Sequence, residues 1–338
     1  MIEIAITSAI VAIAIFVLTS LFEYFMIPLL RKLKVEQLVR SDGPDWHKKK
    51  NGTPTMGGLG FVFATLIVMA GFFLVRAYRG DSSSFIPLAL TLAYAASNAA
   101  IGFVDDYCKL LKHDNEGLTE AQKFFLQLVM AAAYLCVMTY TGNLDTLVTV
   151  PFFNTSIELG WFYYPLALLV LTGVVNGGNI TDGVDGLASS VTAVMGVLFI
   201  AVAFLLCDLQ LSLVGSILVG TTLGFLIYNR HPAKVFMGDT GSLFFGAIVI
   251  AAAFQTDAEL IGLIVAAVYI IEMLSSFLQK MVFKITRIMT GKGRRIFRIA
   301  PLHHLFESYG WRENQVVTVF ALAETVFCMI AFWAYLLL

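Results

Sequence analysis

Ten long apolar runs constrain the fold of this chain more than any other feature of its sequence. A helix that crosses a bilayer needs roughly 20 mostly apolar residues, so each run is a candidate span. The eighth run is short. The ninth continues into an apolar and basic segment that we expect to bend or to leave the membrane as an amphipathic helix. The pattern predicts an all-α polytopic membrane protein with ten transmembrane helices, near residues 5–30, 57–76, 85–104, 124–141, 161–177, 187–206, 210–228, 241–255, 259–280 and 316–338.

The composition supports this interpretation and argues against several others. Hydrophobic residues make up 59% of the 338 positions and charged residues only 13%, whereas a soluble protein carries roughly 25% charged residues. The formal net charge of −1 gives no reason to expect nucleic acid. Four scattered cysteines follow no Cys-x-x-Cys or cysteine–histidine spacing, which argues against disulfides and zinc. We therefore expect one integral membrane domain over residues 1–338, with a retained first span.

The placement of lysine and arginine predicts how the chain is threaded. Segments 31–56, 105–123, 229–240 and 280–315 hold 20 of the 22 basic residues. Because basic residues accumulate in cytoplasmic loops, we predict that these segments face the cytoplasm and that both termini lie outside. The outer connection at 142–160 carries two short β-prone stretches around a polar turn, which predict a small β-hairpin.

Polar residues gather at the predicted cytoplasmic ends of the spans. The stretch at 176–186, Asn-Gly-Gly-Asn-Ile-Thr-Asp-Gly-Val-Asp-Gly, sets four glycines beside two carboxylates and two carboxamides between two apolar runs. Glycines let the backbone come close to a ligand. Oxygen ligands without thiolates suit Mg²⁺, and Mg²⁺ in turn suggests a phosphate substrate. The acids that fall on this side are Asp105, Asp106, Asp182, Asp185 and Asp239.

Each of these acids also has an ordinary structural explanation. Asp105 and Asp106 fit a solvated pair at a helix end with Lys109 as partner, and Asp239 fits the N-cap of the eighth helix. We weigh a ligand role above these explanations because the acids occur together. Of the two aspartates within 176–186, one is expected to cap the sixth helix, which leaves the other for a ligand.

Three glutamates, Glu23, Glu272 and Glu324, fall inside apolar runs. An acid within the membrane is costly and is a candidate functional group by default. No basic residue lies at matching depth in the sequence. We therefore predict hydrogen bonding between helices for these three residues, with Glu324 at an oligomer contact, in preference to a role in transport.

Five short motifs occur along the chain, at 53–58 (Thr-Pro-Thr-Met-Gly-Gly), 105–107 (Asp-Asp-Tyr), 179–186 (Asn-Ile-Thr-Asp-Gly-Val-Asp-Gly), 236–239 (Phe-Met-Gly-Asp) and 300–304 (Ala-Pro-Leu-His-His). Together they resemble the phospho-N-acetylmuramoyl-pentapeptide transferase family, in the superfamily of polyprenyl-phosphate N-acetylhexosamine-1-phosphate transferases. The resemblance covers essentially the whole chain. It implies that undecaprenyl phosphate attacks UDP-MurNAc-pentapeptide with the help of Mg²⁺, which gives lipid I and UMP. It also implies a homodimer in the bacterial plasma membrane with a cytoplasmic active site.

The resemblance implies roles for individual residues as well. Asp239 is implied as the metal ligand, and Asp105 resembles a base proposed to act on the lipid phosphate. The family often has three successive histidines, and Leu305 stands at the third place here. The implied catalytic residues are Asp105, Asp106, Asp239, His303 and His304. The implied substrate-binding residues are Lys50, Thr55, Asn179, Asp182, Asp185, Asn229 and Phe236, of which Lys50, Asp185 and Phe236 match positions that recognise uridine.

The sequence leaves alternatives open for both the mechanism and the function. A phosphate monoester has a second pKa of about 6, so the lipid nucleophile gains little from a base, and Asp105 is expected to orient it or to bind metal. A two-step route through a phosphorylated aspartate is an alternative. A UDP-GlcNAc:polyprenol-phosphate GlcNAc-1-phosphate transferase is the second candidate function. A secondary transporter or lipid flippase is the candidate from another class, but it predicts polar groups near mid-membrane and paired halves.

Overall fold

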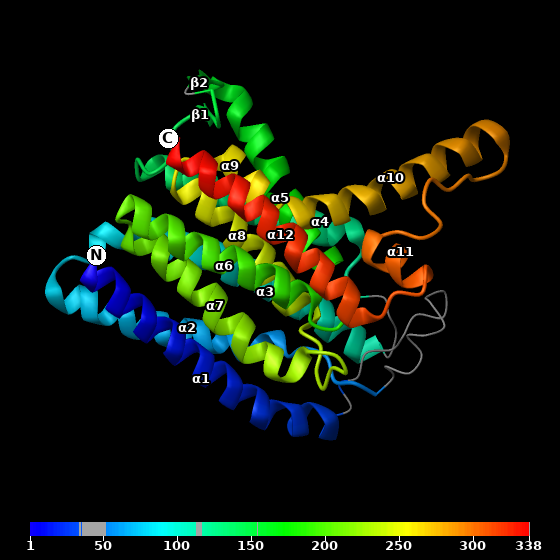
Figure 1. The fold of residues 1–338 in the computed structure, drawn as a ribbon, viewed down its shortest axis with the longest axis horizontal. Coiled ribbons are helices and arrows are strands. Elements are labelled where there is room, and N and C mark those ends of the chain that lie inside the picture. Colours follow the sequence, from blue (N-terminus) through cyan, green and yellow to red (C-terminus); the bar gives the residue numbers. More distant parts are fainter. Residues whose placement is uncertain (34, 36–51, 113–116, 154, 338) are drawn as a thin grey trace.

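The computed structural model describes residues 1–33, 35, 52–112, 117–153 and 155–337. Within these residues the chain is a bundle of helices with one small hairpin at an end (Figure 1). The helices are α1 (Ile2–Lys32), α2 (Gly58–Arg79), α3 (Ile86–Lys112), α4 (Glu120–Tyr140), α5 (Tyr163–Thr181), α6 (Leu187–Leu206), α7 (Leu209–Asn229), α8 (Gly238–Gln255), α9 (Glu259–Val265), α10 (Ala267–Thr290), α11 (Leu302–Ser308) and α12 (Glu313–Leu336), with short 3₁₀ turns η2 (Ser82–Phe85) and η3 (Gly160–Phe162).

Most of these helices are suited to cross a membrane. Among the described residues nine helices are long and apolar enough, and the α9–α10 pair, bent by 76°, brings the number to ten if it is one span. The predicted all-α membrane architecture is confirmed, and so is the bend expected in the ninth run. Both termini lie at the same end of the bundle (Figure 1), as an even number of crossings requires. The side of the membrane that this end faces stays a prediction.

The predicted hairpin is confirmed in the connection between α4 and α5. Strands β1 (Leu147–Val150) and β2 (Thr155–Glu158) pair antiparallel, with Leu147 opposite Glu158. The ring of Phe152 in the turn packs against Trp333 of α12, with 5.1 Å between ring centroids. The hairpin therefore covers the end of the bundle where α12 finishes.

Helix α8 is the centre of the bundle, and glycines decide how close its neighbours come. Its residues 240–254 are all buried. A Cβ on Gly102 of α3 would lie 2.2 Å from the carbonyl oxygen of Asp239, and a Cβ on Gly58 of α2 would lie 2.4 Å from the backbone nitrogen of Gly241. Small residues permit this kind of backbone contact between membrane helices. The last turns of α3 are thereby brought against the first turn of α8.

The polar stretch at 176–186 is only partly a loop. Its first six residues complete α5, and Gly186 is the N-cap of α6 with a φ of 76°. The prediction that Asp182 or Asp185 caps α6 is therefore wrong, because a glycine in the left-handed conformation begins that helix. Asp182 instead follows the last residue of α5 as its C-cap.

The three glutamates within apolar runs are fully buried inside the chain but differ in their contacts. Glu272 hydrogen-bonds His303 of α11, which confirms a bond between helices for that residue. Glu23 has no hydrogen-bond partner among the described residues, so the prediction is wrong for it. Glu324 accepts a 3.4 Å hydrogen bond from the Cys328 thiol. Because Glu324 is not at the surface, the predicted oligomer contact through its side chain is wrong.

Helix α10 projects away from the bundle, and the chain then returns alongside it to α11 (Figure 1). Its outer part exposes apolar side chains such as Phe277 and Ile288. The Gln279 side chain accepts hydrogen bonds from the backbone N–H groups of Ile296 and Phe297, both at 3.0 Å. These bonds hold the returning segment against α10 and so fix where α11 begins.

Candidate active site

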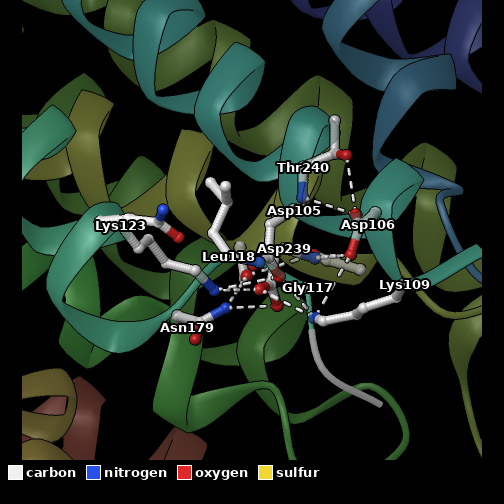
Figure 2. Close-up of polar contacts among 12 residues, drawn as sticks. Asp105, Asp106, Lys109, Gly117, Leu118, Lys123, Asn179, Asp239 and Thr240 are labelled. Carbon is white, nitrogen blue, oxygen red and sulfur yellow. Dashed lines mark hydrogen bonds and ion pairs between the residues drawn. The ribbon is translucent and has the colours of Figure 1, made fainter. Parts of the chain in front are cut away.

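Three aspartates meet where α3 ends and α8 begins. Asp105 and Asp106 lie on α3 and Asp239 lies in the first turn of α8, and one oxygen from each carboxylate lies within 4.8 Å of the others. Asp105 is 1% exposed and Asp106 is 5% exposed. The alternative of a solvated pair of acids at a helix end is therefore wrong. The three aspartates that were grouped from the sequence are therefore close together in the structure (Figure 2).

Two lysines neutralise most of the charge of this carboxylate cluster. The Lys109 Nζ lies 2.6 Å from Asp105 Oδ2 and 3.1 Å from Asp239 Oδ2. Lys123, at the start of α4, lies 3.1 Å from Asp105 Oδ2 and pairs most closely with Asp239 Oδ2. The two ammonium groups bridge the same two carboxylates (Figure 2). Three carboxylates against two ammonium groups leave one formal negative charge, which keeps the cluster attractive to a cation.

Asp106 holds the first turn of α8. Its Oδ1 accepts the backbone N–H of Asp239 at 3.1 Å, and its Oδ2 accepts the backbone N–H and hydroxyl of Thr240 at 3.0 and 2.8 Å. These N–H groups begin a helix and have no partner within it. Asp239 is not the N-cap, since Met237 occupies that place. A Cβ on Gly238 would lie 2.6 Å from Asp106 Oδ2. Asp106 therefore completes α8 from a neighbouring helix and orients Asp239.

Each remaining oxygen of Asp105 and Asp239 has its own donor. Asp105 Oδ1 accepts the backbone N–H of Leu118 at 2.8 Å. Asp239 Oδ1 accepts the Asn179 Nδ2–H at 2.8 Å, and the same amide nitrogen contacts the Ser242 hydroxyl at 2.8 Å. The predicted site residue Asn179 thus lies in the cluster, on the last turn of α5. Asp239 is held by residues from α3, α4 and α5 together.

The residues of the cluster fit a divalent cation. All three converging ligands are carboxylate oxygens, the donor type that hard ions such as Mg²⁺ take in proteins. The unbalanced negative charge is of the right sign. Both Asp106 oxygens are bound by backbone N–H groups that begin α8, whereas Asp105 Oδ2 and Asp239 Oδ2 are contacted by lysine side chains, which can move. Asp239 and Asp105 are therefore the residues that would hold the ion. The two lysines contact these same oxygens and would share them with it.

A second polar group forms around Asp185, one of the residues that the resemblance implies in substrate binding. The His231 Nδ1 lies 3.1 Å from Asp185 Oδ2 and 3.5 Å from Glu313 Oε2. Asp185 Oδ2 also accepts the Ala233 N–H at 3.0 Å. The group joins the turn before α6, the connection from α7 to α8, and the first turn of α12. Its donor atoms lie within 4.8 Å of one another, so it too has the composition of a cation site.

Asn229 fixes the backbone around this second group. Its Oδ1 accepts the Gly186 N–H at 3.1 Å, and its Nδ2 donates to the Val235 carbonyl at 2.9 Å. The side chain is 1% exposed. Both polar groups of Asn229 are engaged by the chain, and its predicted ligand role stays a prediction.

The motif at 53–58 pairs with the motif that contains Asp239. The Phe236 N–H donates to the Pro54 carbonyl at 2.8 Å, and the Gly57 N–H donates to the Phe236 carbonyl at 2.9 Å. The Thr55 hydroxyl oxygen lies 3.1 Å from where a Cβ of Gly238 would be. Thr55 and Phe236 are thereby placed at the start of α8, beside the carboxylate cluster. Lys50, another predicted ligand, lies outside the described residues.

The paired histidines lie on α11, next to the turn at 182–186. His303 is fully buried and contacts Glu272, while His304 Nδ1 lies 2.7 Å from Glu307 Oε2. The two rings meet edge to face, with 4.2 Å between centroids. A Cβ on Gly183 would lie 2.1 Å from His303 Nε2. The motif at 300–304 thus reaches the 176–186 stretch through His303.

Sequence reasoning missed Lys123, His231 and Glu313, and gave Lys109 only a structural part. All four are charged or titratable groups on the predicted cytoplasmic side. Basic residues there are also the ordinary signal of membrane orientation, so their sequence positions alone do not separate a site lysine from a topology determinant. For Lys109 a signal exists, since it follows Asp105 by four residues and Asp106 by three, the spacing of neighbours on a helix.

Fold and cluster together define a polytopic membrane protein with a buried acid–lysine centre at one end of its helices. Residues 88–257, which include the three aspartates and both lysines, match the family described as "Glycosyl transferase family 4". A phospho-N-acetylmuramoyl-pentapeptide-transferase of Clostridium perfringens (strain SM101 / Type A) is 41% identical over 317 residues, which cover 94% of this chain and 93% of the relative.

A protein of the same name from Halalkalibacterium halodurans is 38% identical over 318 residues, 94% of each chain. Another, from Clostridium acetobutylicum, is 40% identical over 307 residues, 90% of this chain and 92% of the relative. The chain belongs to the family of phospho-N-acetylmuramoyl-pentapeptide-transferases, within glycosyl transferase family 4. Membership is consistent with a divalent metal cofactor.

Replacement of Lys123 by methionine should destabilise the chain far more than replacement of Lys280. Lys123→Met leaves Asp105 and Asp239 with one lysine, and its side chain is only 16% exposed, so we expect a loss of about 2–3 kcal/mol. Lys280 forms a comparable pair with Glu120, but both side chains are largely exposed, and Lys280→Met should cost about 0–1 kcal/mol. Unfolding by denaturant in detergent measures both. Equal stability of the two variants would show that the ion pairs of Lys123 with Asp105 and Asp239 do not stabilise the chain.

Proposed function

We propose that the chain transfers phospho-MurNAc-pentapeptide from UDP-MurNAc-pentapeptide to undecaprenyl phosphate, which yields lipid I and UMP. The observation that carries the proposal is the centre in which Lys109 and Lys123 bridge Asp105 and Asp239, beside Asp106, at the end of apolar helices. A reaction between a soluble diphosphate and a lipid-linked phosphate needs charged groups at such a place. The names of the relatives, compared above, support the same reaction.

The two lysines have the task of receiving the diphosphate. Phosphoryl transfer needs positioning and charge neutralisation more than covalent help from the protein. The side chain of Lys109 is 34% exposed and that of Lys123 is 16% exposed, so both reach the centre without being sealed in it. Each ammonium group can exchange a carboxylate oxygen for a phosphate oxygen. The aspartates therefore preorganise the lysines before the substrate binds.

Asp105 orients the reacting groups in this proposal and does not need to remove a proton. Its Oδ1 is engaged by the Leu118 N–H, and its Oδ2 lies beside both lysines. A phosphate monoester has a second pKa of about 6 and is mostly dianionic at neutral pH, so it is already a nucleophile. Asp106 acts one step further back, through the first turn of α8 that carries Asp239.

We assign Mg²⁺ as the cofactor, held by Asp239 with Asp105. A bound Mg²⁺ would add to the neutralisation of the diphosphate that the lysines begin. The convergence of hard oxygen donors at one place supports this assignment. A one-step transfer fits the cluster best, since Asp105, Asp106 and Asp239 each have other donors in contact with their oxygens.

The nucleotide and sugar occupy the neighbouring surface in this proposal. Asp185 and Phe236 recognise the uridine together with Lys50, and Asp185 is oriented for this by the contacts of the second polar group. The remaining residues face the phosphates, the sugar or the structure that holds them, namely Thr55, Asn179, Asp182, Asn229, His303 and His304. The support is that these residues, apart from Lys50, lie on elements that the 176–186 stretch or the start of α8 contacts.

The membrane setting follows from the substrates. Undecaprenyl phosphate lies in the bilayer, and a nucleotide-linked precursor is soluble, so the cluster must lie at an interface open to both. We place the chain in the bacterial plasma membrane, with this end facing the cytoplasm and both termini outside. The excess of basic residues at this end supports that orientation. A homodimer is part of the proposal, with a contact that does not involve Glu324.

The other candidate functions fit the structure less well. A transporter or flippase predicts charged groups near mid-membrane in broken, paired helices. Here the charged cluster lies where α3 ends and α8 begins, at the end of these helices. A transferase acting on UDP-GlcNAc would use the same cluster, so only the substrate distinguishes it from the proposed enzyme.

Release of UMP tests the proposal directly. Purified chain with undecaprenyl phosphate and UDP-MurNAc-pentapeptide should release UMP and form lipid I in equal amounts. Chelation of divalent cations should stop the reaction, and added Mg²⁺ should restore it. Asp239→Asn should be inactive, whereas Lys280→Met should be unaffected, because the pair of Lys280 with Glu120 is exposed. Release of UMP only from UDP-GlcNAc would identify the second transferase instead, and release from neither substrate would exclude both.

The role of Asp105 can be separated by pH. If Asp105 orients the substrate, Asp105→Asn should lower the rate by the same factor, about 10- to 100-fold, at every pH from 6 to 9. The ratio of variant to wild-type rates, measured by UMP release, removes pH effects that the two chains share. A deficit that disappears as the pH rises would show that Asp105 acts as a base.

A further inference from the structure

The buried histidine of α11 is held by a glutamate from another helix. Glu272 of α10 and His303 are both fully buried. Glu272 Oε1 accepts the backbone N–H of His303 at 3.1 Å, and Glu272 Oε2 lies 3.0 Å from the ring Nδ1 of the same residue. Both oxygens of the Glu272 carboxylate therefore contact His303, one at its backbone and one at its ring. Together the two contacts fix the position of the residue and the rotation of its ring.

The other ring nitrogen points at the polar stretch at 176–186. His303 Nε2 is buried and has no hydrogen-bond partner among the described residues. A Cβ on Gly183 would lie 2.1 Å from Nε2. The ring can lie here only because residue 183 has no side chain. His303 is thereby set directly against the turn that carries Asp182 and Asp185.

Backbone packing places Glu272 where it can hold the ring. A Cβ on Gly177 of α5 would lie 2.7 Å from the carbonyl oxygen of Tyr269 on α10, so the two helices touch at this point. Glu272 follows Tyr269 by three residues and lies on the same face of α10. The contact between α5 and α10 therefore fixes the part of α10 from which Glu272 reaches His303.

We infer that Glu272 is a positioning residue that keeps a proton on Nδ1 of His303 and sets Nε2 against the turn at Gly183. A carboxylate accepts hydrogen bonds and does not donate them, so its partner nitrogen must carry the proton. The hydrogen bond at one ring nitrogen then decides the state of the other. The role in turnover rests on the proposed function, in which His303 lines the nucleotide-sugar pocket.

A glutamine at position 272 separates this role from simple packing. Gln has nearly the shape of Glu but offers one acceptor oxygen where Glu272 uses two. The backbone N–H of His303 cannot reverse its direction, so it takes the oxygen. The amide NH₂ then faces Nδ1, which must become the acceptor. Glu272→Gln is therefore expected to move the proton from Nδ1 to Nε2 without opening a cavity.

Nitrogen-15 NMR of histidine-labelled chain reads the proton directly. The chain has five histidines, and His303→Asn assigns the signal of His303 by its loss. Wild-type chain without substrate should show a protonated Nδ1, and Glu272→Gln should show an unprotonated one. Glu324→Gln, which changes another fully buried glutamate, should leave the His303 signal as in wild type. An unprotonated Nδ1 in wild type, or an unchanged signal in Glu272→Gln, would overturn the inference.

Activity supplies the second measurement. Glu272→Gln should lower kcat/KM for UMP release by about 10- to 100-fold, the usual effect of losing a group that orients a functional histidine. If Glu272 acts through His303, Glu272→Gln combined with His303→Ala should be no slower than His303→Ala alone. Additive losses would show separate roles and overturn the inference. The NMR result needs no substrate, so a chain that is inactive toward UDP-MurNAc-pentapeptide would refute the proposed function and leave the NMR test standing.

Discussion

The mutual repulsion of three carboxylates, two of them buried and the third only 17% exposed, is the constraint on which the rest of the site depends. Asp105, Asp106 and Asp239 lie within a few ångströms of one another in surroundings that exclude most water, where like charges repel strongly. Lys109 and Lys123 form ion pairs that offset the charges of Asp105 and Asp239. The N–H groups in the first turn of α8 donate hydrogen bonds to the third carboxylate, that of Asp106. None of this is possible unless α3, α4, α5 and α8 meet closely, which the glycines of the bundle permit. Compensation of the carboxylate charges therefore requires the close packing of these helices.

The 176–186 stretch connects the carboxylate cluster to His303 and to the second polar group around Asp185. Its first part bonds Asp239 through Asn179, its turn touches His303 at Gly183, and its last part bonds His231 through Asp185 and Asn229 through the Gly186 N–H. A ligand that shifts any of these contacts would therefore act on the same segment, the end of α5 and the turn before α6. In the proposed function, the stretch would couple recognition of the nucleotide to the placement of Asp239, whose other carboxylate oxygen contacts the two lysines.

Much of this could be predicted from sequence because it follows from local pattern. Apolar length gives the spans, β-prone stretches give the hairpin, and the acids that occur together in sequence motifs do meet. The rest depends on contacts between distant elements. Lys123 looks like any cytoplasmic lysine until α4 packs beside α3, and Asp106 caps a helix that begins 132 residues later. Likewise Glu272 meets its histidine only because α10 is bent away from α9 and the chain then returns to α11. Residues 176–181 have the composition of a loop although they complete α5.

We propose that the divalent-cation centre is the cluster of Asp105, Asp106 and Asp239, and not the second group with similar ligands. Titration of purified chain with Mn²⁺, followed by electron paramagnetic resonance, tests it most directly because Mn²⁺ takes the same oxygen ligands as Mg²⁺. We expect Asp239→Asn to lose the bound ion, whereas His231→Ala, which changes the group of Asp185, His231 and Glu313, should retain it. Loss of the ion in His231→Ala with full binding in Asp239→Asn would show that the second group is the cation site instead.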